Sequence, residues 1–223
     1  MISLTNTGLS NVSLHLDNTV TVAKFGIPPQ AQQPGVNYTL DTGDNRFENR
    51  SLQVGNRILN TATSNLDGLF PAPAWYNFNI GVSPHTLVSS NVWYASNTSY
   101  DWHPSVNATT VGATSGDLGE IFTTWMSTDP NNNVNVQLRA GGGLGDSPPT
   151  GVTGVPVYTS PLPLTNQTDS KGVHRTGDYS YIALYPAAAL GCASANEIGI
   201  LTGETAGPAS GLWGTRVGIV KHC

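Results

Sequence analysis

Apolar and polar residues alternate along several short stretches of the chain, and this pattern restricts its fold more than any other feature. The alternation is clearest at residues 12–16, 134–138 and 179–185. A period of two places every second side chain on the same face of a β-strand, whereas a helix needs a period of about 3.6. The sequence contains no long stretch with the helical period. We therefore expect an all-β protein with little helix.

Turn-forming residues interrupt these stretches at intervals of roughly 10–20 residues, which separates about ten short strands. Residues 46–66 and 117–126 also fit a helical turn or a short helix, but their β-branched and aromatic content favours strands. Many short strands without alternating helices are typical of an antiparallel β-sandwich or a jelly roll. The predicted strands are residues 12–16, 20–25, 36–40, 46–66, 75–82, 87–95, 117–126, 134–138, 179–185, 197–201 and 212–221.

The connections between these strands define the expected organisation. The first two strands form a hairpin around an Asp-Asn turn. Residues 26–35 and 69–74 are predicted to be loops because prolines interrupt them, and the Gly- and Pro-rich residues 141–163 form a long connection. The whole chain, 1–223, is thus predicted to be one β domain with long loops. A sub-boundary or a loop insertion at 141–163 is the alternative.

Charged residues make up only 10% of the chain, which restricts its surface chemistry. The sequence has 25 Thr, 20 Asn and 19 Ser. We expect these neutral hydrogen-bonding side chains to take the surface role that Lys and Glu usually fill. Five Trp, eight Tyr and a net charge of −5 argue against a disordered chain, which would have few aromatic residues and a high net charge.

The nine Lys and Arg residues are scattered, with no basic run at either end of the sequence. A flexible arm that packages nucleic acid needs such a run to neutralise phosphates, and docking on an anionic membrane also needs basic residues. No stretch of 18 apolar residues is present, and residues 1–6 lack the character of a signal peptide. We therefore expect neither nucleic-acid binding through a basic arm nor a membrane span.

The tripeptide Asp41-Thr42-Gly43 follows a predicted strand and matches the short signature of aspartic proteases. In those enzymes two aspartates share a proton and activate water. Here Asp44 follows, where that family has a small Ser, Thr or Ala, and neither a flap nor the second family motif is recognisable. A turn held by an Asx-type hydrogen bond accounts for the same residues. We favour the turn and expect no catalytic residues.

Other patterns that accompany chemistry are incomplete. Residues 141–146 are Gly-rich, but a phosphate-binding loop also needs a Lys-Ser/Thr pair and a following helix. Ser115 and Ser210 are not centred in a Gly-x-Ser-x-Gly motif, and the five His residues stand singly. Without a CxxC pair or a Cys/His cluster, we expect no metal site and no cofactor. Whether Cys192 and Cys223 form a disulfide is left open.

The most suggestive group of side chains surrounds residues 100–103. Aromatic rings beside Asp and Asn side chains suit a sugar, because a ring packs on the apolar face of a pyranose while polar groups bond its hydroxyls. The alternative, which we favour, is that these large aromatic side chains are packed in the core. The candidate ligand-binding residues are Trp93, Tyr100, Asp101, Trp102 and His103.

Six Asn-x-Ser/Thr sequons occur, and each is a candidate glycan acceptor if the protein is secreted by a glycosylating organism. In a chain this rich in Asn, Ser and Thr, sequons also arise by chance. They begin at Asn11, Asn37, Asn49, Asn97, Asn107 and Asn166.

These observations favour a protein that presents surfaces over an enzyme. We predict a structural protein of a virus or phage particle, such as a capsid, outer-shell, decoration or spike domain. It would be a homo-oligomer located in the virion, because a weakly charged surface offers little electrostatic barrier to self-association. Other virion proteins and host glycans are further candidate partners. The alternative is an extracellular or cell-surface carbohydrate-binding, adhesin or filament domain, and a hydrolase on a β scaffold is favoured least.

Overall fold

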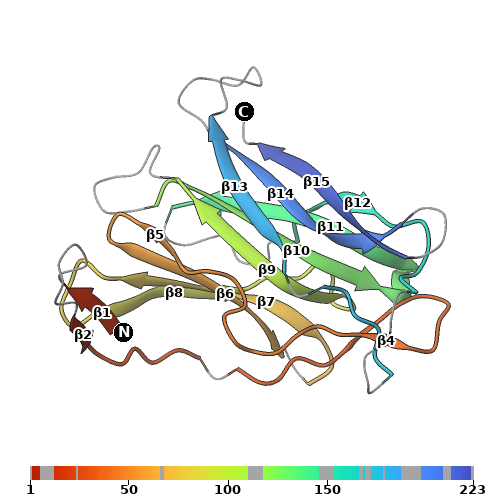
Figure 1. Ribbon diagram of the computed structural model, residues 1–223, viewed down its shortest axis with the longest axis horizontal. Helices are drawn as coiled ribbons and strands as arrows, with labels where there is room; N and C mark the ends of the chain where they lie inside the picture. Colours follow the sequence, from red (N-terminus) through yellow and green to blue (C-terminus); the bar gives the residue numbers. More distant parts are fainter. Residues whose placement is uncertain are drawn as a thin grey trace.

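The computed structural model describes most of the chain, and its regular structure is almost entirely β. In the described part, fifteen strands are accompanied by a single short 3-10 turn, Pro130–Asn132 (Figure 1). The prediction of an all-β protein is confirmed. The described residues are 2–5, 13–23, 25–65, 68–109, 118–145, 153–165, 168, 172–177, 179–186, 197–207 and 212–221.

Three antiparallel sheets form the body of the protein. The first sheet has the order β5-β6-β7-β8, from Leu52–Val54, Arg57–Asn65, Pro71–Asn79 and Thr86–Val92. The central sheet has the order β12-β11-β10-β9, from Val155–Thr159, Val134–Leu144, Glu120–Asp129 and Tyr100–Ala108. The outer sheet has the order β13-β14-β15, from Tyr181–Pro186, Glu197–Ala206 and Trp213–Lys221.

Two small hairpins accompany these sheets. They are β1 with β2, Ile2–Thr5 with Ser13–Leu16, and β3 with β4, Ala31–Gln32 with Thr39–Leu40. The β1-β2 hairpin lies at one end of the body, beside the first sheet (Figure 1).

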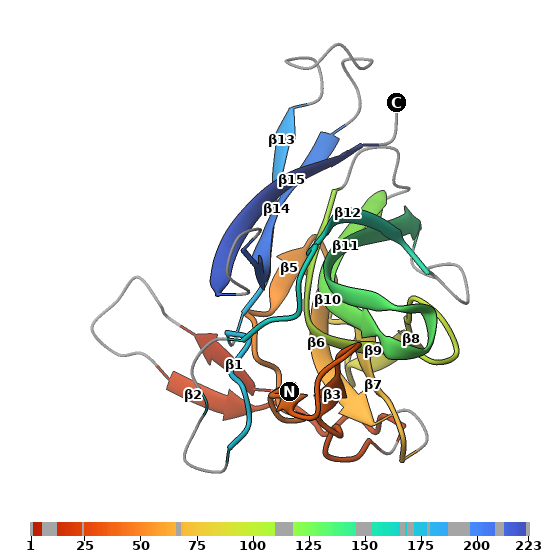
Figure 2. The ribbon, with the colours of Figure 1, turned by 90° about the vertical axis from the view of Figure 1, so that its right-hand side faces the viewer.

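The sheets stack as layers, with the central sheet between the other two (Figure 2). Trp75 of the first sheet packs with Trp93 and with Ile121 of the central sheet. On its other face the central sheet packs Phe122 against Ile182 of the outer sheet. Ile121 and Phe122 are adjacent on β10, so the alternation of a strand sends one side chain into each interface. The antiparallel sandwich predicted from the sequence is therefore confirmed, with a third layer added.

The strand order within the sheets is a succession of meanders. Every hydrogen-bonded neighbour in the three sheets is also a neighbour in the sequence. A jelly roll is instead built from two Greek keys, in which distant strands lie side by side. The fold shares the packed antiparallel sheets of that architecture but has this simpler connectivity.

The β9 strand was not predicted, because the central sheet is buried on both faces. Every residue of Tyr100–Ala108 is buried. In a sequence, a strand is recognised by the contrast between an apolar and a polar face, and a strand that is covered on both sides lacks this contrast. Its polar members, such as Ser105 and Asn107, are buried along with its aromatic ones.

Three predicted connections are corrected by the structure. Strand β2 pairs with β1 and not with residues 20–25, where Val20 and Val22 instead pack in irregular conformation against the cluster around Tyr76. Residues 71–74 belong to strand β7. Its prolines are tolerated because the ladder between β7 and β8 begins only at Ala74, so their missing N–H groups leave no gap in it.

The long connection predicted at 141–163 is also partly strand. Residues 141–144 extend β11 opposite β10, and residues 155–159 form β12, an edge strand in which Pro156 is tolerated. Leu138, before this segment, and Leu201, after it, share one core. Apolar packing therefore continues across the segment.

Many of the Thr, Ser and Asn residues lie inside the protein, which corrects the expectation that they mainly serve its surface. Buried threonines bond the backbone of neighbouring strands: Thr123 Oγ1 donates to the Ser105 carbonyl at 2.9 Å, and Thr124 Oγ1 donates to the Arg139 carbonyl at 2.8 Å. A buried hydroxyl is tolerated when it is hydrogen-bonded. This composition therefore supports the interior as well as the surface.

Candidate functional site

The aromatic residues of the predicted ligand group are packed inside the protein. Trp93 and Trp102 have no exposed surface, and Tyr100 is buried. Trp93 stacks obliquely between Trp75 and Trp125, with ring centres 6.1 and 6.3 Å away. Rings enclosed in this way present no face to a sugar, and their burial agrees with the packing alternative.

Asp101 is the centre of a buried hydrogen-bond network. Its carboxylate accepts hydrogen bonds from Trp125 Nε1 at 2.8 Å, from Ser99 Oγ at 2.5 Å and from the Ala95 N–H at 3.2 Å. Burial, the dominant effect, raises the pKa of Asp101 to about 6, although the hydrogen bonds from Ser99, Ser127, Trp125 and Ala95 oppose this shift. The carboxyl group thus supports the interior of the central sheet and does not line an open site.

The raised pKa of Asp101 predicts a stability that depends on pH. Between about pH 4 and pH 6 the folded protein retains a proton that the unfolded chain has released, so rising pH favours the unfolded chain. The free energy of unfolding should fall by roughly 2–3 kcal/mol across this range because of this one group. We expect urea denaturation at several pH values to show the decrease in the wild type and to show it weakened in Asp101→Asn. Parallel pH profiles of the two proteins would contradict this assignment.

His103 is the member of the predicted group that lies at a cleft. The pairing of β9 with β10 shifts register opposite His103, because Trp102 pairs with Met126 and Ser105 pairs with Thr124. This bulge gives His103 a φ of 48°, which costs a residue with a side chain on the order of 1–3 kcal/mol.

Side-chain hydrogen bonds hold the backbone of His103 in this unusual conformation. The His103 N–H donates to Thr63 Oγ1 at 3.0 Å, and its carbonyl accepts from Ser180 Oγ at 2.5 Å. Its imidazole is 1% exposed and Nδ1 lies 2.7 Å from Glu48 Oε2. The other ring nitrogen, Nε2, is buried, and no described residue forms a hydrogen bond with it.

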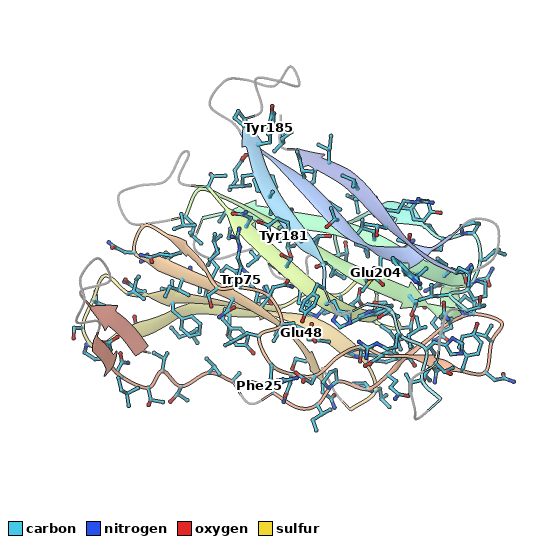
Figure 3. All side chains as sticks on the ribbon, in the orientation of Figure 1. Phe25, Glu48, Trp75, Tyr181, Tyr185 and Glu204 are labelled. Atoms are coloured by element: carbon cyan, nitrogen blue, oxygen red, sulfur yellow. The ribbon has the colours of Figure 1, made fainter. Side chains whose placement is uncertain are left out.

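The loop at residues 41–48 forms the opposite wall of the cleft. The Gly43 N–H donates to Asp41 Oδ1 at 3.0 Å, which is the Asx-type turn favoured for this motif. Gly43 has a φ of 73°, and a side chain there would overlap the Glu48 carboxylate and approach His103 Cε1 to 2.8 Å. Gly43, near the start of the loop, therefore lies directly against the pair that Glu48, at the end of the loop, forms with His103. Figure 3 labels Glu48.

A distant segment, residues 172–177, closes the cleft on a third side. It runs beside β4, where the Asp41 N–H donates to the His174 carbonyl at 2.9 Å and the His174 N–H donates to the Thr39 carbonyl at 3.0 Å. Thr176 Oγ1 donates to the Asp41 carbonyl at 2.8 Å. These bonds place Arg175, and after it Tyr179, at the cleft, which has a volume of about 560 Å³.

Sequence reasoning had identified only part of this cleft. The sequence points to Asp41 and Gly43 through the protease-like motif, and to His103 through the aromatic group. Glu48, Arg175 and Tyr179 were not singled out, because they come from segments that meet only in the folded chain. The acidic residues in the turn after β4 were the only local signal that could have pointed here.

The outer face of the outer sheet is a second candidate site. The pairing of β13, β14 and β15 places Tyr181, Tyr185, Val217 and Ile219 on the side away from the central sheet. Exposure rises to 68% at Val217 and is 52% at Ile219. Figure 3 labels both tyrosines on β13. We call this surface, completed by Trp213 on β15, the apolar face.

The edges of the outer sheet are also available. Among the described strands, β13 and β15 each pair only with β14. An unpaired edge beside an apolar surface is a common place for another chain to dock.

The remaining motifs add no further site in the described part of the chain. Ser115, Ser210, Cys192 and Cys223 lie outside the described residues. Among residues that the structure does describe, no three His, Cys, Asp or Glu side chains gather where they could hold a metal ion. Nor does any helix there have the length and hydropathy to cross a membrane.

Two of the sequons have their asparagine amides engaged within the fold. Asn107 is buried and donates to the Ile182 carbonyl at 3.1 Å, and Asn49 donates to the Pro104 carbonyl at 2.6 Å. Asn37 and Asn97 are exposed, and Asn11 and Asn166 lie outside the described residues.

Comparison with known proteins found no matching family model, no matching curated protein and no matching solved structure. The function of this chain is therefore inferred from its own geometry.

Proposed function

We propose that this protein is a structural subunit of a virus or phage particle and that it associates with copies of itself through the apolar face. The observation that carries the proposal is that β15 presents Trp213, Val217 and Ile219 to solvent in alternation, beside Tyr181 and Tyr185 of β13. Large aromatic and aliphatic side chains in one surface are typical of the centre of a protein interface.

The size of the apolar face fits an interface between two copies. Its five large side chains expose on the order of 500 Å² in total, given about 150–250 Å² for each fully exposed aromatic residue. A standard interface buries about 800 Å² on each partner, of which roughly 60% is apolar. The face therefore supplies about the apolar area that one side of such an interface needs.

The charge of the apolar face also favours a second copy as the partner. Glu204 lies on this side of the outer sheet, and the strand register places Lys221 on the same side. The Arg50 guanidinium lies 5.3 Å from the centre of the Tyr181 ring and donates to the Tyr181 hydroxyl at 2.6 Å. A surface that carries few charges, and charges of both signs, meets its own copy without strong net repulsion, as a twofold interface requires. The low proportion of charged residues in the whole chain, 10%, is consistent with further contacts in a larger particle.

We expect light scattering coupled to size-exclusion chromatography to show a dimer or larger assembly of the wild type, and negative-stain microscopy to show rings or shells. Val217→Lys should give a monomer at the same concentration, because a lysine on each copy would be desolvated and would face its equivalent. Such an arrangement costs several kcal/mol, which weakens association at least about 100-fold.

A matched control uses a valine on a different surface. Val88 on β8 is 38% exposed and lies on the first sheet, away from the apolar face. Val88→Lys should assemble as the wild type does. A wild type that stays monomeric at high concentration, or a Val217→Lys variant that assembles normally, would refute the proposal.

A further inference from the structure

The cleft between the loop at residues 41–48 and His103 has the dimensions and polarity of a small-molecule site. Its volume of about 560 Å³ lies within the range of roughly 300–1,000 Å³ that such sites occupy. We propose that it binds a neutral saccharide. The cleft shares no residue with the apolar face, so this inference does not depend on self-association.

The buried imidazole of His103 is the first observation that points to a ligand. Nδ1 is fixed by Glu48, and the ring edge at Cε1 faces Gly43 of the cleft wall. Nε2 on the same ring is buried and has no hydrogen-bond partner among the residues that the structure describes. An unsatisfied buried polar atom costs about 1–3 kcal/mol. Of the eight such side-chain atoms in the described part of the chain, His103 Nε2 is the one whose residue lines the cleft. A ligand hydroxyl that reached Nε2 would recover this cost.

The backbone at this position gives independent support. His103 is held at a φ of 48° by a bulge and by bonds from Thr63 and Ser180. Strained residues and bulges cluster at binding sites, where they direct a side chain to a position that a regular strand would not reach. Here the bulge directs His103 toward the loop that carries Glu48.

The balance of charge in the cleft favours a neutral ligand. Asp44 is paired with Arg46, whose Nε lies 2.6 Å away, and Glu48 is paired with His103. A charged ligand would therefore meet groups of both signs, whereas hydroxyls can accept from the guanidinium groups and donate to the carboxylates. The charged and titratable groups that line the cleft are Asp41, Asp44, Arg46, Glu48, His103, Arg175 and Tyr179.

Exposed aromatic rings at the cleft make a sugar the best fit among neutral polar ligands. Tyr179 is 63% exposed and Phe47 is 48% exposed, so each ring has a free surface. A pyranose combines an apolar face, which packs on such a ring, with hydroxyls at its edge. The residues that line the cleft offer both kinds of contact.

The test is a glycan array that carries neutral, sialylated and sulfated glycans, followed by calorimetric titration of the best ligand. We expect the full-length protein to bind neutral glycans and Tyr179→Ala to bind them at least tenfold more weakly. Addition of the neutral glycan should also shift the imidazole nitrogen resonances of His103, which a surface contact elsewhere would leave unchanged.

Phe25→Ala is the matched control, because Phe25 is an exposed aromatic residue that does not line the cleft. It should bind the glycan as the wild type does. Three results would overturn the proposal: an array without bound glycans, binding confined to sialylated or sulfated glycans, or full affinity in Tyr179→Ala. Circular dichroism spectra of each variant, compared with that of the wild type, distinguish a loss of glycan binding from a loss of folding.

Discussion

Replacing Trp102 by alanine is expected to lower the free energy of unfolding by about 3–5 kcal/mol. Its side chain has no exposed surface and packs with Leu40, Met126 and Leu164, which come from three distant parts of the chain. Its Nε1 also donates to Thr176 Oγ1 at 3.1 Å. Removal of the ring leaves a large cavity where these segments meet and leaves the hydroxyl of Thr176 without this donor.

Thermal and urea denaturation measure this effect. For a chain of this length, the expected loss corresponds to a melting temperature lower by roughly 10 °C. Trp213→Ala is the control, because Trp213 is 57% exposed on the apolar face. It should change the free energy of unfolding by about 0.5 kcal/mol or less while weakening self-association. Equal stability losses in the two variants would contradict the assignment of Trp102 to the core and Trp213 to an interface.

Arg139→Lys is expected to cost about 2–4 kcal/mol although the charge is kept. The guanidinium of Arg139 is buried, and burial lowers its pKa. It donates to the Thr153 carbonyl at 2.8 and 3.1 Å, to the Gly154 carbonyl at 3.0 Å and to Gln137 Oε1 at 2.6 Å. A lysine cannot reach all of these acceptors, because its ammonium group is a single point on a flexible stem.

The loss should be concentrated at the start of β12, since Arg139 ties β11 to the residues that precede that strand. Hydrogen exchange should therefore accelerate most at the amides of β12. The control is Arg46→Lys, because Arg46 is exposed and pairs with Asp44 at the surface, where such pairs contribute little. Uniform exchange across the central sheet of Arg139→Lys would show that the guanidinium has no such local role.

Strand prediction succeeded where one face of a strand is exposed and the other is covered. Tyr181 is exposed and Ile182 is buried, and this contrast appears in the sequence as alternation. The same logic fails in the central sheet, where the adjacent residues Val106 and Asn107 are buried on opposite faces of β9. Alternation also does not specify which strands pair: β2 pairs with β1, which precedes it, and not with residues 20–25, which follow it.

The candidate site was predictable to a smaller extent. The sequence points to His103 because it stands beside aromatic residues, but those residues are packed in the core, and the partner that fixes its ring is Glu48. Arg175 reaches the cleft because residues 172–177 pair with residues near β4. A contact between segments so far apart in sequence leaves no periodic or local signal in either of them.

The alternation of apolar and polar residues thus determined the β class and the antiparallel character of this protein, because the two faces of a strand are a property of neighbouring residues. The low charge and the neutral polar composition favour the hypothesis of a protein that presents surfaces. The two surfaces on which the proposals rest become visible only in the tertiary structure. The apolar face and the cleft arise from the way sheets stack and loops meet, and stacking depends on contacts between residues that are distant in the chain.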